Sequence, residues 1–301
     1  MLKPFQLKLE TFILMLALIV SSATLAASET AAIDFTTIKQ QAGFANAAYA
    51  PEDRIRAFVE SQGYTLNLYK TDPGIQVSYF LATSESTKTQ VISVRGTSNI
   101  ENAMVNISLK LRLDKKTGIY LHEGFLFAAR RVYAELKPLL NRDYKIRTTG
   151  HSLGGAVAMI LAMLLDSDQF DIDQVTTFGQ PKVTNPAGAK VLNRLNIIRV
   201  VMPLDLVPLA PPFDPLDINN IDIYWHAGKE VVLLAENQYA ILQGLDSMLR
   251  ATRFTQKLLS QENVKNHEMS AYLNQVGLKT KSSSLVPYEN DFNLFNLFGT
   301  Q

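Results

Sequence analysis

A five-residue segment, Gly150-His151-Ser152-Leu153-Gly154, constrains the fold of this 301-residue chain more than any other feature. It follows the short apolar run 144–149 and precedes the uninterrupted apolar stretch 154–165, a pattern that predicts a strand, a tight turn and a helix. In such a turn the serine takes a strained backbone conformation, and side chains two residues before and after it would collide. Glycine at both positions therefore predicts a nucleophilic serine at a helix amino end, where N–H groups favour developing negative charge.

Strands and helices are expected to alternate on both sides of this turn. Between residues 89 and 202 predicted strands alternate with predicted helices, which favours a mainly parallel sheet covered by helices on both faces, an α/β fold. The predicted strands are 64–70, 75–83, 89–95, 144–149, 175–178 and 197–202, with a further hairpin from 221–225 and 230–234. The predicted helices are 34–49, a segment from Pro51 to Gln62, 122–140, 154–165, 247–260 and 267–276.

The amino terminus has the pattern of a secretory signal. Lys3 and Lys8 precede the apolar run 12–20, and small residues follow it. An uncleaved membrane anchor is the alternative, because the uncharged stretch spans 18 residues, but its second half is rich in Ser, Ala and Thr. We therefore expect residues 1–27 to be a signal peptide, residues 28–301 to form one domain, and the protein to be secreted or periplasmic.

The composition excludes several classes of site. The chain has 29 Lys and Arg against 28 Asp and Glu, so it lacks the basic surface that nucleic-acid binding requires. It contains no cysteine, which excludes thiolate zinc sites, iron–sulfur clusters and cysteine nucleophiles. With only four histidines, an all-histidine metal site is not expected either. We expect no cofactor, no metal, no nucleic-acid partner and no obligate protein partner.

A serine nucleophile requires a base, and the base requires an acceptor that orients it. Two histidines, His226 and His267, follow Ser152 in the chain. His226 lies in an apolar, strand-like run, whereas His267 follows a polar stretch and begins a predicted helix, a position from which a side chain can reach the serine. We therefore favour His267 as the base, and we expect His122 and His151 to be structural.

The orienting acceptor is expected to be Asp205. This residue follows the predicted strand 197–202, and α/β folds carry their sites beyond the carboxyl ends of their strands. Few other charged residues surround it in the sequence. Asp214 and Asp217 lie in the Pro-rich loop that follows and are interpreted as solvated loop residues.

Taken together, these motifs resemble the class 3 lipases, which are triacylglycerol-lipase-like α/β-hydrolases. The resemblance covers about residues 34–275. It is carried by Val94-Arg95-Gly96-Thr97-Ser98, His122-Glu123-Gly124-Phe125, the segment from Thr149 to Ala156, the segment from Thr177 to Val183, and the segment from Asp205 to Pro212. One departure is visible: Asn266 precedes His267, where the family often has Asp, and Tyr272 stands five residues after the histidine.

The resemblance implies an α/β-hydrolase fold and a complete catalytic site. Ser152, Asp205 and His267 are implied as the triad. The backbone N–H groups of Thr97 and Leu153 are implied as donors to the oxyanion, together with the Thr97 hydroxyl. One such donor typically contributes about 2.7–4 kcal/mol to transition-state stabilisation.

The resemblance also implies a lid over the site, at about residues 98–113. Residues 100–104 have the spacing of a short amphipathic helical turn, whereas 105–113 alternate strictly, which fits either a lid or an ordinary half-buried strand. An apolar lid face suits a lipid ester substrate at a lipid–water interface. The implied activity is triacylglycerol hydrolysis. The alternatives are a phospholipase A1, a feruloyl-type esterase or an acyltransferase on the same scaffold and, from a different class, a non-catalytic lipid- or partner-binding protein.

Overall fold

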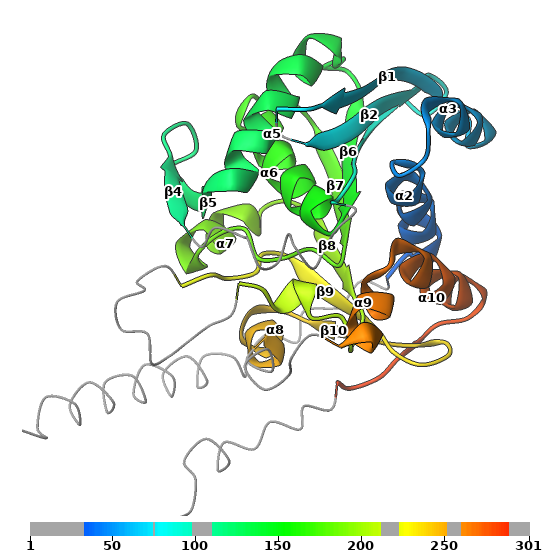
Figure 1. Ribbon diagram of the computed structural model, residues 1–301, viewed down its shortest axis with the longest axis vertical. Helices are drawn as coiled ribbons and strands as arrows, with labels where there is room; N and C mark the ends of the chain where they lie inside the picture. The colour runs from blue at the N-terminus through cyan, green and yellow to red at the C-terminus, as the bar shows by residue number, and fades with distance from the viewer. Residues whose placement is uncertain (1–32, 75, 98–109, 212–222, 252–259, 289–301) are drawn as a thin grey trace, which may run out of the picture. The chain divides into compact units, whose positions relative to one another are not determined.

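The computed structural model describes residues 33–74, 76–97, 110–211, 223–251 and 260–288 (Figure 1). The chain divides into a unit of residues 1–34, of which only the last two are described, and a unit of residues 35–301. The predicted signal peptide and most of the predicted lid therefore lie outside the described residues. Within the described ranges, no helix is long and apolar enough to cross a membrane.

A large sheet forms the centre of the second unit, with the order β1-β2-β3-β6-β7-β8-β9-β10-β11 among its described strands. The strands from β3 to β9 in this order pair in parallel, whereas β2 pairs with both β1 and β3, and β10 with β9, in antiparallel fashion. The strands are β1 (Thr65–Asp72), β2 (Val77–Ser84), β3 (Thr89–Val94), β6 (Lys145–His151), β7 (Ile172–Phe178), β8 (Ile197–Val201), β9 (Lys229–Leu233), β10 (Gln238–Leu242) and β11 (Ser284–Leu285).

Helices cover both faces of this sheet (Figure 1). Alternation along β2 separates the two faces, because Tyr79 and Leu81 pack with α5 and α6, whereas Phe80 and Ala82 pack with α2 and α3. The predicted α/β architecture is therefore confirmed. The helices are α2 (Phe35–Ala47), α3 (Glu52–Ser61), α5 (Glu123–Leu136), α6 (Leu153–Ser167), α7 (Pro186–Leu192), α8 (Gly244–Ala251), α9 (Gln261–His267) and α10 (Met269–Lys281).

Helix α6 crosses the middle of the core directly after Ser152. Residues 154–165 are all buried, which explains why this helix is apolar around its whole circumference rather than along one stripe. It packs on β6, β7 and α5. The amino end of α6 is therefore fixed against the carboxyl end of the strand that precedes it.

The predicted hairpin from 221–225 and 230–234 is wrong. Strand β9 pairs with β10, at Val231↔Ile241, and on its other side with β8. Trp225 instead forms an isolated antiparallel bridge with Thr184. The turn that makes the real hairpin contains Glu236, whose φ of 51° is unusual for a non-glycine residue, so no turn signature marked it.

A second hairpin, β4 (Leu111–Asp114) and β5 (Ile119–His122), leads into α5. The end of the alternating stretch 105–113 thus lies in a strand, and the rest of that stretch lies outside the described residues. Helix α7 was also not predicted, although Asn185 caps it and Pro186 begins it, a common combination at helix starts.

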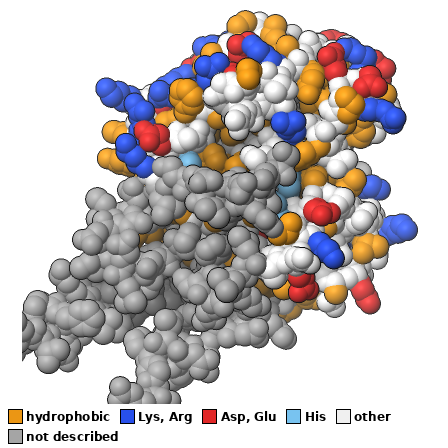
Figure 2. All heavy atoms as spheres, in the orientation of Figure 1, with side chains coloured by type: hydrophobic (Ala, Val, Ile, Leu, Met, Phe, Trp, Pro, Cys, Tyr) orange, Lys and Arg blue, Asp and Glu red, His pale blue; other side chains and the backbone are white. Residues whose placement is uncertain are grey.

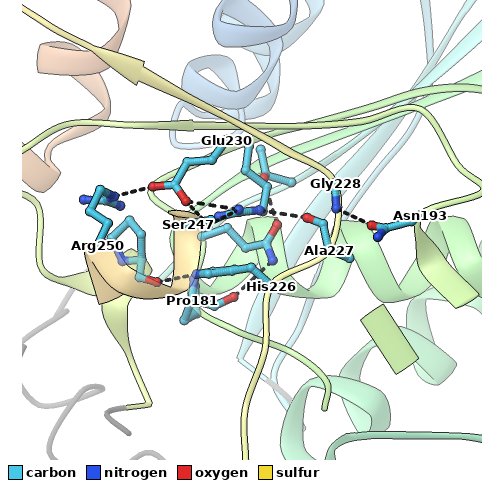
Figure 3. Close-up of polar contacts among 12 residues, drawn as sticks. Pro181, Asn193, His226, Ala227, Gly228, Glu230, Ser247 and Arg250 are labelled. Carbon is cyan, nitrogen blue, oxygen red and sulfur yellow. Dashed lines mark hydrogen bonds and ion pairs between the residues drawn. The ribbon is translucent and has the colours of Figure 1, made fainter. Parts of the chain in front are cut away.

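A buried cluster of charged side chains joins β8, β9 and α8 (Figure 3). The carboxylate of Glu230 pairs with Arg250, accepts a hydrogen bond from the Ser247 hydroxyl, and lies 3.2 Å from Nη2 of Arg199. Burial alone would raise the pKa of Glu230, but Arg250 and Arg199 hold it below its usual value. The carboxylate therefore stays ionised between two buried guanidinium groups.

Lys182 supports the loop that carries Asp205. Its Nζ donates to the backbone carbonyls of Leu209 and Pro211, at 2.7 and 2.8 Å. The side chain is fully buried, and this burial, only partly offset by Glu230, lowers the pKa of Lys182 to about 7. The loop after β8 is thus stabilised by hydrogen bonds from the Lys182 side chain as well as by its own turns.

Replacing Glu230 by glutamine is expected to destabilise the fold by about 3–5 kcal/mol, because it leaves two buried guanidinium charges without their shared anion. Urea unfolding followed by circular dichroism measures this loss. Glu135→Gln is the matched control, since its ion pair with Lys70 is about two-fifths exposed and should contribute no more than about 1 kcal/mol. Equal unfolding midpoints for the two variants would contradict this account of the cluster.

Candidate active site

Ser152 lies in a strained turn between β6 and α6. Its φ of 56° and ψ of −133° are sparsely populated for a residue with a side chain, and its N–H donates to the Phe178 carbonyl at 2.8 Å. A Cβ on Gly150 would lie 2.6 Å from the backbone of Gly154, and a Cβ on Gly154 would lie 2.3 Å from the Val94 carbonyl oxygen. Glycine is therefore required on both sides of the serine, as the sequence pattern predicts.

His267 and Asp205 form a buried pair. Nδ1 of His267 lies 2.8 Å from Oδ2 of Asp205, and Asp205 is fully shielded from solvent. The same Oδ2 accepts a hydrogen bond from the Tyr272 hydroxyl at 2.5 Å, and Oδ1 accepts one from the Val207 N–H at 2.9 Å. Because an ionised carboxylate only accepts, Nδ1 of His267 carries the hydrogen, and its Nε2 is the basic nitrogen.

The turn after β7 brings these residues and Ser152 together. Gly179 has a φ of 58°, and a Cβ there would lie 2.8 Å from Oδ2 of Asp205 and 2.9 Å from Cε1 of His267. The carbonyl of the preceding residue, Phe178, is the one that accepts the Ser152 N–H. The three residues predicted to form a triad therefore surround a single turn at the carboxyl edge of the sheet.

Two atoms at this centre have no hydrogen-bond partner among the described residues. They are Oγ of Ser152 and Nε2 of His267, and both are buried. A buried polar atom without a partner is costly and rare in native proteins. A serine hydrolase transfers a proton between two atoms of these kinds. The hydrogen bond between a catalytic serine and its histidine is often long without substrate and shortens when substrate binds.

The two expected oxyanion donors lie on either side of the serine. Leu153 is the first residue of α6, so its N–H has no acceptor within the helix. Thr97 follows Gly96, whose added Cβ would lie 3.0 Å from Cβ of Ser152. Thr97 is exposed and is the last described residue before the segment 98–109.

The remaining predicted candidates lie elsewhere. His226 is buried beside the charged cluster (Figure 3). Its Nε2 bonds the Pro208 carbonyl at 2.6 Å, and His122 accepts a hydrogen bond from an N–H in the first turn of α5. Asp214 and Asp217 lie outside the described residues. In the described ranges, no group of three or more His, Asp or Glu side chains could hold a metal ion.

The position of His267 differs from the expectation in one respect. It ends α9 rather than beginning a helix, and the polar stretch before it is helical, closed at its start by a capping box between Ser260 and Asn263. The role of Tyr272 was also not predicted. It is fully buried, and burial together with Asp205 raises its pKa well above the usual value, so its hydroxyl keeps the proton that it donates to Asp205.

Comparison with known proteins finds a similarity to lipases over the middle of the chain. The model of the family described as Lipase (class 3) matches residues 91–214. A secreted mono- and diacylglycerol lipase of Fusarium solani is 35% identical over 145 residues, which span 45% of this chain and 43% of that protein. A lipase of Rhizomucor miehei is 33% identical over 145 residues, or 44% of this chain and 40% of that protein. The matched segments thus span less than half the length of these relatives.

A solved structure extends the likeness beyond the matched segment. The lipase from Rhizopus microsporus var. chinensis superposes with a TM-score of 0.58 at 26% identity, covering 69% of this chain and 78% of that chain. Its likeness supports the predicted α/β-hydrolase fold, in agreement with the sheet order described above. Over residues 91–214 the chain is therefore similar to the class 3 lipases.

Proposed function

We propose that the protein hydrolyses carboxylic esters of lipids, with triacylglycerols as the substrate class, and that Ser152 is its nucleophile. The single observation that carries this proposal is the clustering of a strained Ser152 and a buried His267–Asp205 pair around one turn. Support for the substrate class comes from the relatives, one of which is named a mono- and diacylglycerol lipase and another a lipase.

In the proposed first step, Nε2 of His267 takes the hydroxyl proton of Ser152 while Oγ attacks the ester carbonyl carbon. The resulting imidazolium is stabilised by Asp205, which in turn is held by Tyr272 and by the Val207 N–H. His267 then gives the proton to the departing alcohol oxygen, which leaves an acyl group on Ser152. Water, deprotonated by the same nitrogen, attacks the acyl-enzyme and releases the fatty acid.

The backbone N–H groups of Thr97 and Leu153 are proposed to bind the oxyanion of both tetrahedral intermediates. Such donors act on charge that exists only as the reaction proceeds, so they lower the barrier without tightening substrate binding. The amino end of α6 adds a favourable field at the same position. The resemblance to the family supports these assignments, together with the closeness of Gly96 to Ser152.

Secretion, a signal peptide over residues 1–27 and action at a lipid–water interface are part of the same proposal. The basic start and apolar run of the first twenty residues support export. One relative is itself named a secreted lipase. The resemblance implies a lid over residues 98–113, and a lid of this kind fits an interfacial substrate.

A series of p-nitrophenyl esters from acetate to palmitate, given to the chain from residue 28 onward, tests the proposed activity. We expect kcat/KM to rise with acyl-chain length, because a lipase binds the acyl chain in an apolar pocket. Phosphatidylcholine is the comparison substrate, because its rapid hydrolysis would identify a phospholipase rather than a triacylglycerol lipase. Hydrolysis confined to the short esters would preserve the chemistry and contradict the lipid substrate.

A further inference from the structure

A second chain of hydrogen bonds runs behind the proposed triad, through Tyr49 and His151. Nε2 of His151 lies 2.6 Å from the backbone carbonyl oxygen of His267, and Nδ1 of His151 lies 2.7 Å from the Tyr49 hydroxyl. The His151 and His267 rings are 4.6 Å apart between centroids. Neither Tyr49 nor His151 takes part in the proton transfers proposed for Ser152.

The direction of each bond follows from the chemistry of the atoms. The His267 carbonyl can only accept, so Nε2 of His151 must carry the hydrogen. Burial and the neighbouring His267 hold the pKa of His151 well below its usual value, so the ring is neutral and its Nδ1 accepts from the Tyr49 hydroxyl. Although about a third of the Tyr49 side chain is exposed, burial of its hydroxyl raises its pKa to about 12, so it remains a donor.

The other end of the chain reaches the segment expected to bind the oxyanion. Gly96 packs directly against the Tyr49 hydroxyl. A Cβ on Gly96 would lie 2.6 Å from that hydroxyl oxygen, 2.6 Å from the His151 carbonyl oxygen and 3.0 Å from Cβ of Ser152. Gly96 is therefore fixed against the nucleophile turn, and Thr97 follows it directly.

The backbone of His267 needs such a support. His267 is the last residue of α9, and Glu268 breaks the helix with a φ of −61° and a ψ of 136° before α10 begins. The carbonyl of a residue at a helix carboxyl end has no partner within that helix. The ring Nε2–H of His151 donates to this carbonyl, so His267 is held at its main chain by His151 and at its ring by Asp205.

We propose that Tyr49 and His151 are positioning residues, which hold the Gly96–Thr97 segment and the main chain of His267 at a fixed spacing on either side of Ser152. This inference rests on the proposed function, because the spacing matters only if these groups react together. A displacement of about 1 Å in a catalytic group can lower the rate by about 100-fold. His151, expected from the sequence to be structural, thus acquires a role in positioning the proposed catalytic groups.

Steady-state kinetics of four variants on a short p-nitrophenyl ester test this role. We expect His151→Ala to lower kcat by about 100-fold and Tyr49→Phe by about tenfold, with KM within about twofold of the wild-type value, since the groups are misplaced rather than lost. His151→Gln should recover at least tenfold of the loss in kcat, because its side-chain N–H can reach the His267 carbonyl as Nε2 does. Tyr144→Phe is the control, because it removes another hydrogen-bonded tyrosine hydroxyl, one that contacts Lys88 and Glu85.

Thermal unfolding of each variant separates positioning from stability. Equal kcat for Tyr49→Phe and Tyr144→Phe would overturn the inference, and so would a His151→Gln variant no faster than His151→Ala. Losses of kcat that scale with the fraction unfolded would also overturn it. A wild-type protein that neither hydrolyses the ester nor reacts with a fluorophosphonate would instead overturn the proposed function, and this inference with it.

Discussion

Replacing Ser152 by alanine is expected to lower kcat for ester hydrolysis by a factor on the order of 10⁶, as far as loss of the nucleophile lowers it in other serine hydrolases. Alanine removes Oγ, so no acyl-enzyme can form, while the turn and the Asp205–His267 pair remain. The rate is measured with the p-nitrophenyl ester that the wild-type protein cleaves fastest. A small residual rate is expected, because the oxyanion donors still act on water attack.

The control for this variant is Ser270→Ala, which removes an exposed hydroxyl in α10 and should leave kcat unchanged. The unfolding midpoint of Ser152→Ala should equal or exceed that of the wild-type protein, because a buried hydroxyl without a partner is removed. Turnover by Ser152→Ala at more than about a hundredth of the wild-type rate would contradict its role as the nucleophile.

Replacing Asp205 by asparagine is expected to lower kcat by about 10⁴-fold, the loss seen when a triad aspartate becomes an amide. An asparagine amide group can donate to Nδ1 of His267, which forces the hydrogen onto Nε2 and leaves no base facing the serine. The remaining side-chain oxygen keeps its hydrogen bond from the Val207 N–H, whereas the Tyr272 hydroxyl, which donated to Oδ2, now faces the amide NH2 and has to turn to accept from it. The geometry should therefore persist while the tautomer changes.

The Asp205→Asn variant is best followed by kcat as a function of pH. We expect kcat to recover partly at high pH. There a small fraction of Ser152 ionises to the alkoxide, which attacks the ester without a base. Asp143→Asn, at an exposed turn, is the matched control. A loss of less than tenfold in kcat would indicate that another residue orients His267.

Local signals predicted the parts of the fold that depend on neighbouring residues. The turn at Ser152 was predictable because the steric demand for Gly150 and Gly154 is visible in five consecutive residues. The location of Asp205 at the carboxyl edge of the sheet was predictable because it lies in the loop that follows a recognisable apolar strand. Helix α6 was predictable because all of its faces are apolar.

Contacts between distant residues were not predictable in the same way. The sequence did not show whether β9 pairs with residues 221–225 or with β10. Alternation of apolar residues identifies a strand but not the strand with which it pairs. Helix α9 is polar, and its capping box uses an asparagine at the third helical position rather than the usual acid or glutamine. Tyr49 and Tyr272 are far from their hydrogen-bond partners, His151 and Asp205, in the sequence. Nothing in the local sequence of either tyrosine indicates these partners.

The most direct test of the account is whether Ser152 is an activated nucleophile. The wild-type protein is treated with a fluorophosphonate, which phosphonylates an activated serine with loss of fluoride, and the modified peptide is identified by mass spectrometry. The account predicts rapid, stoichiometric modification at Ser152, none in Ser152→Ala, and modification slower by orders of magnitude in Asp205→Asn. Modification at a different serine, or none in a folded wild-type protein, would contradict it and would favour a binding protein that kept the fold.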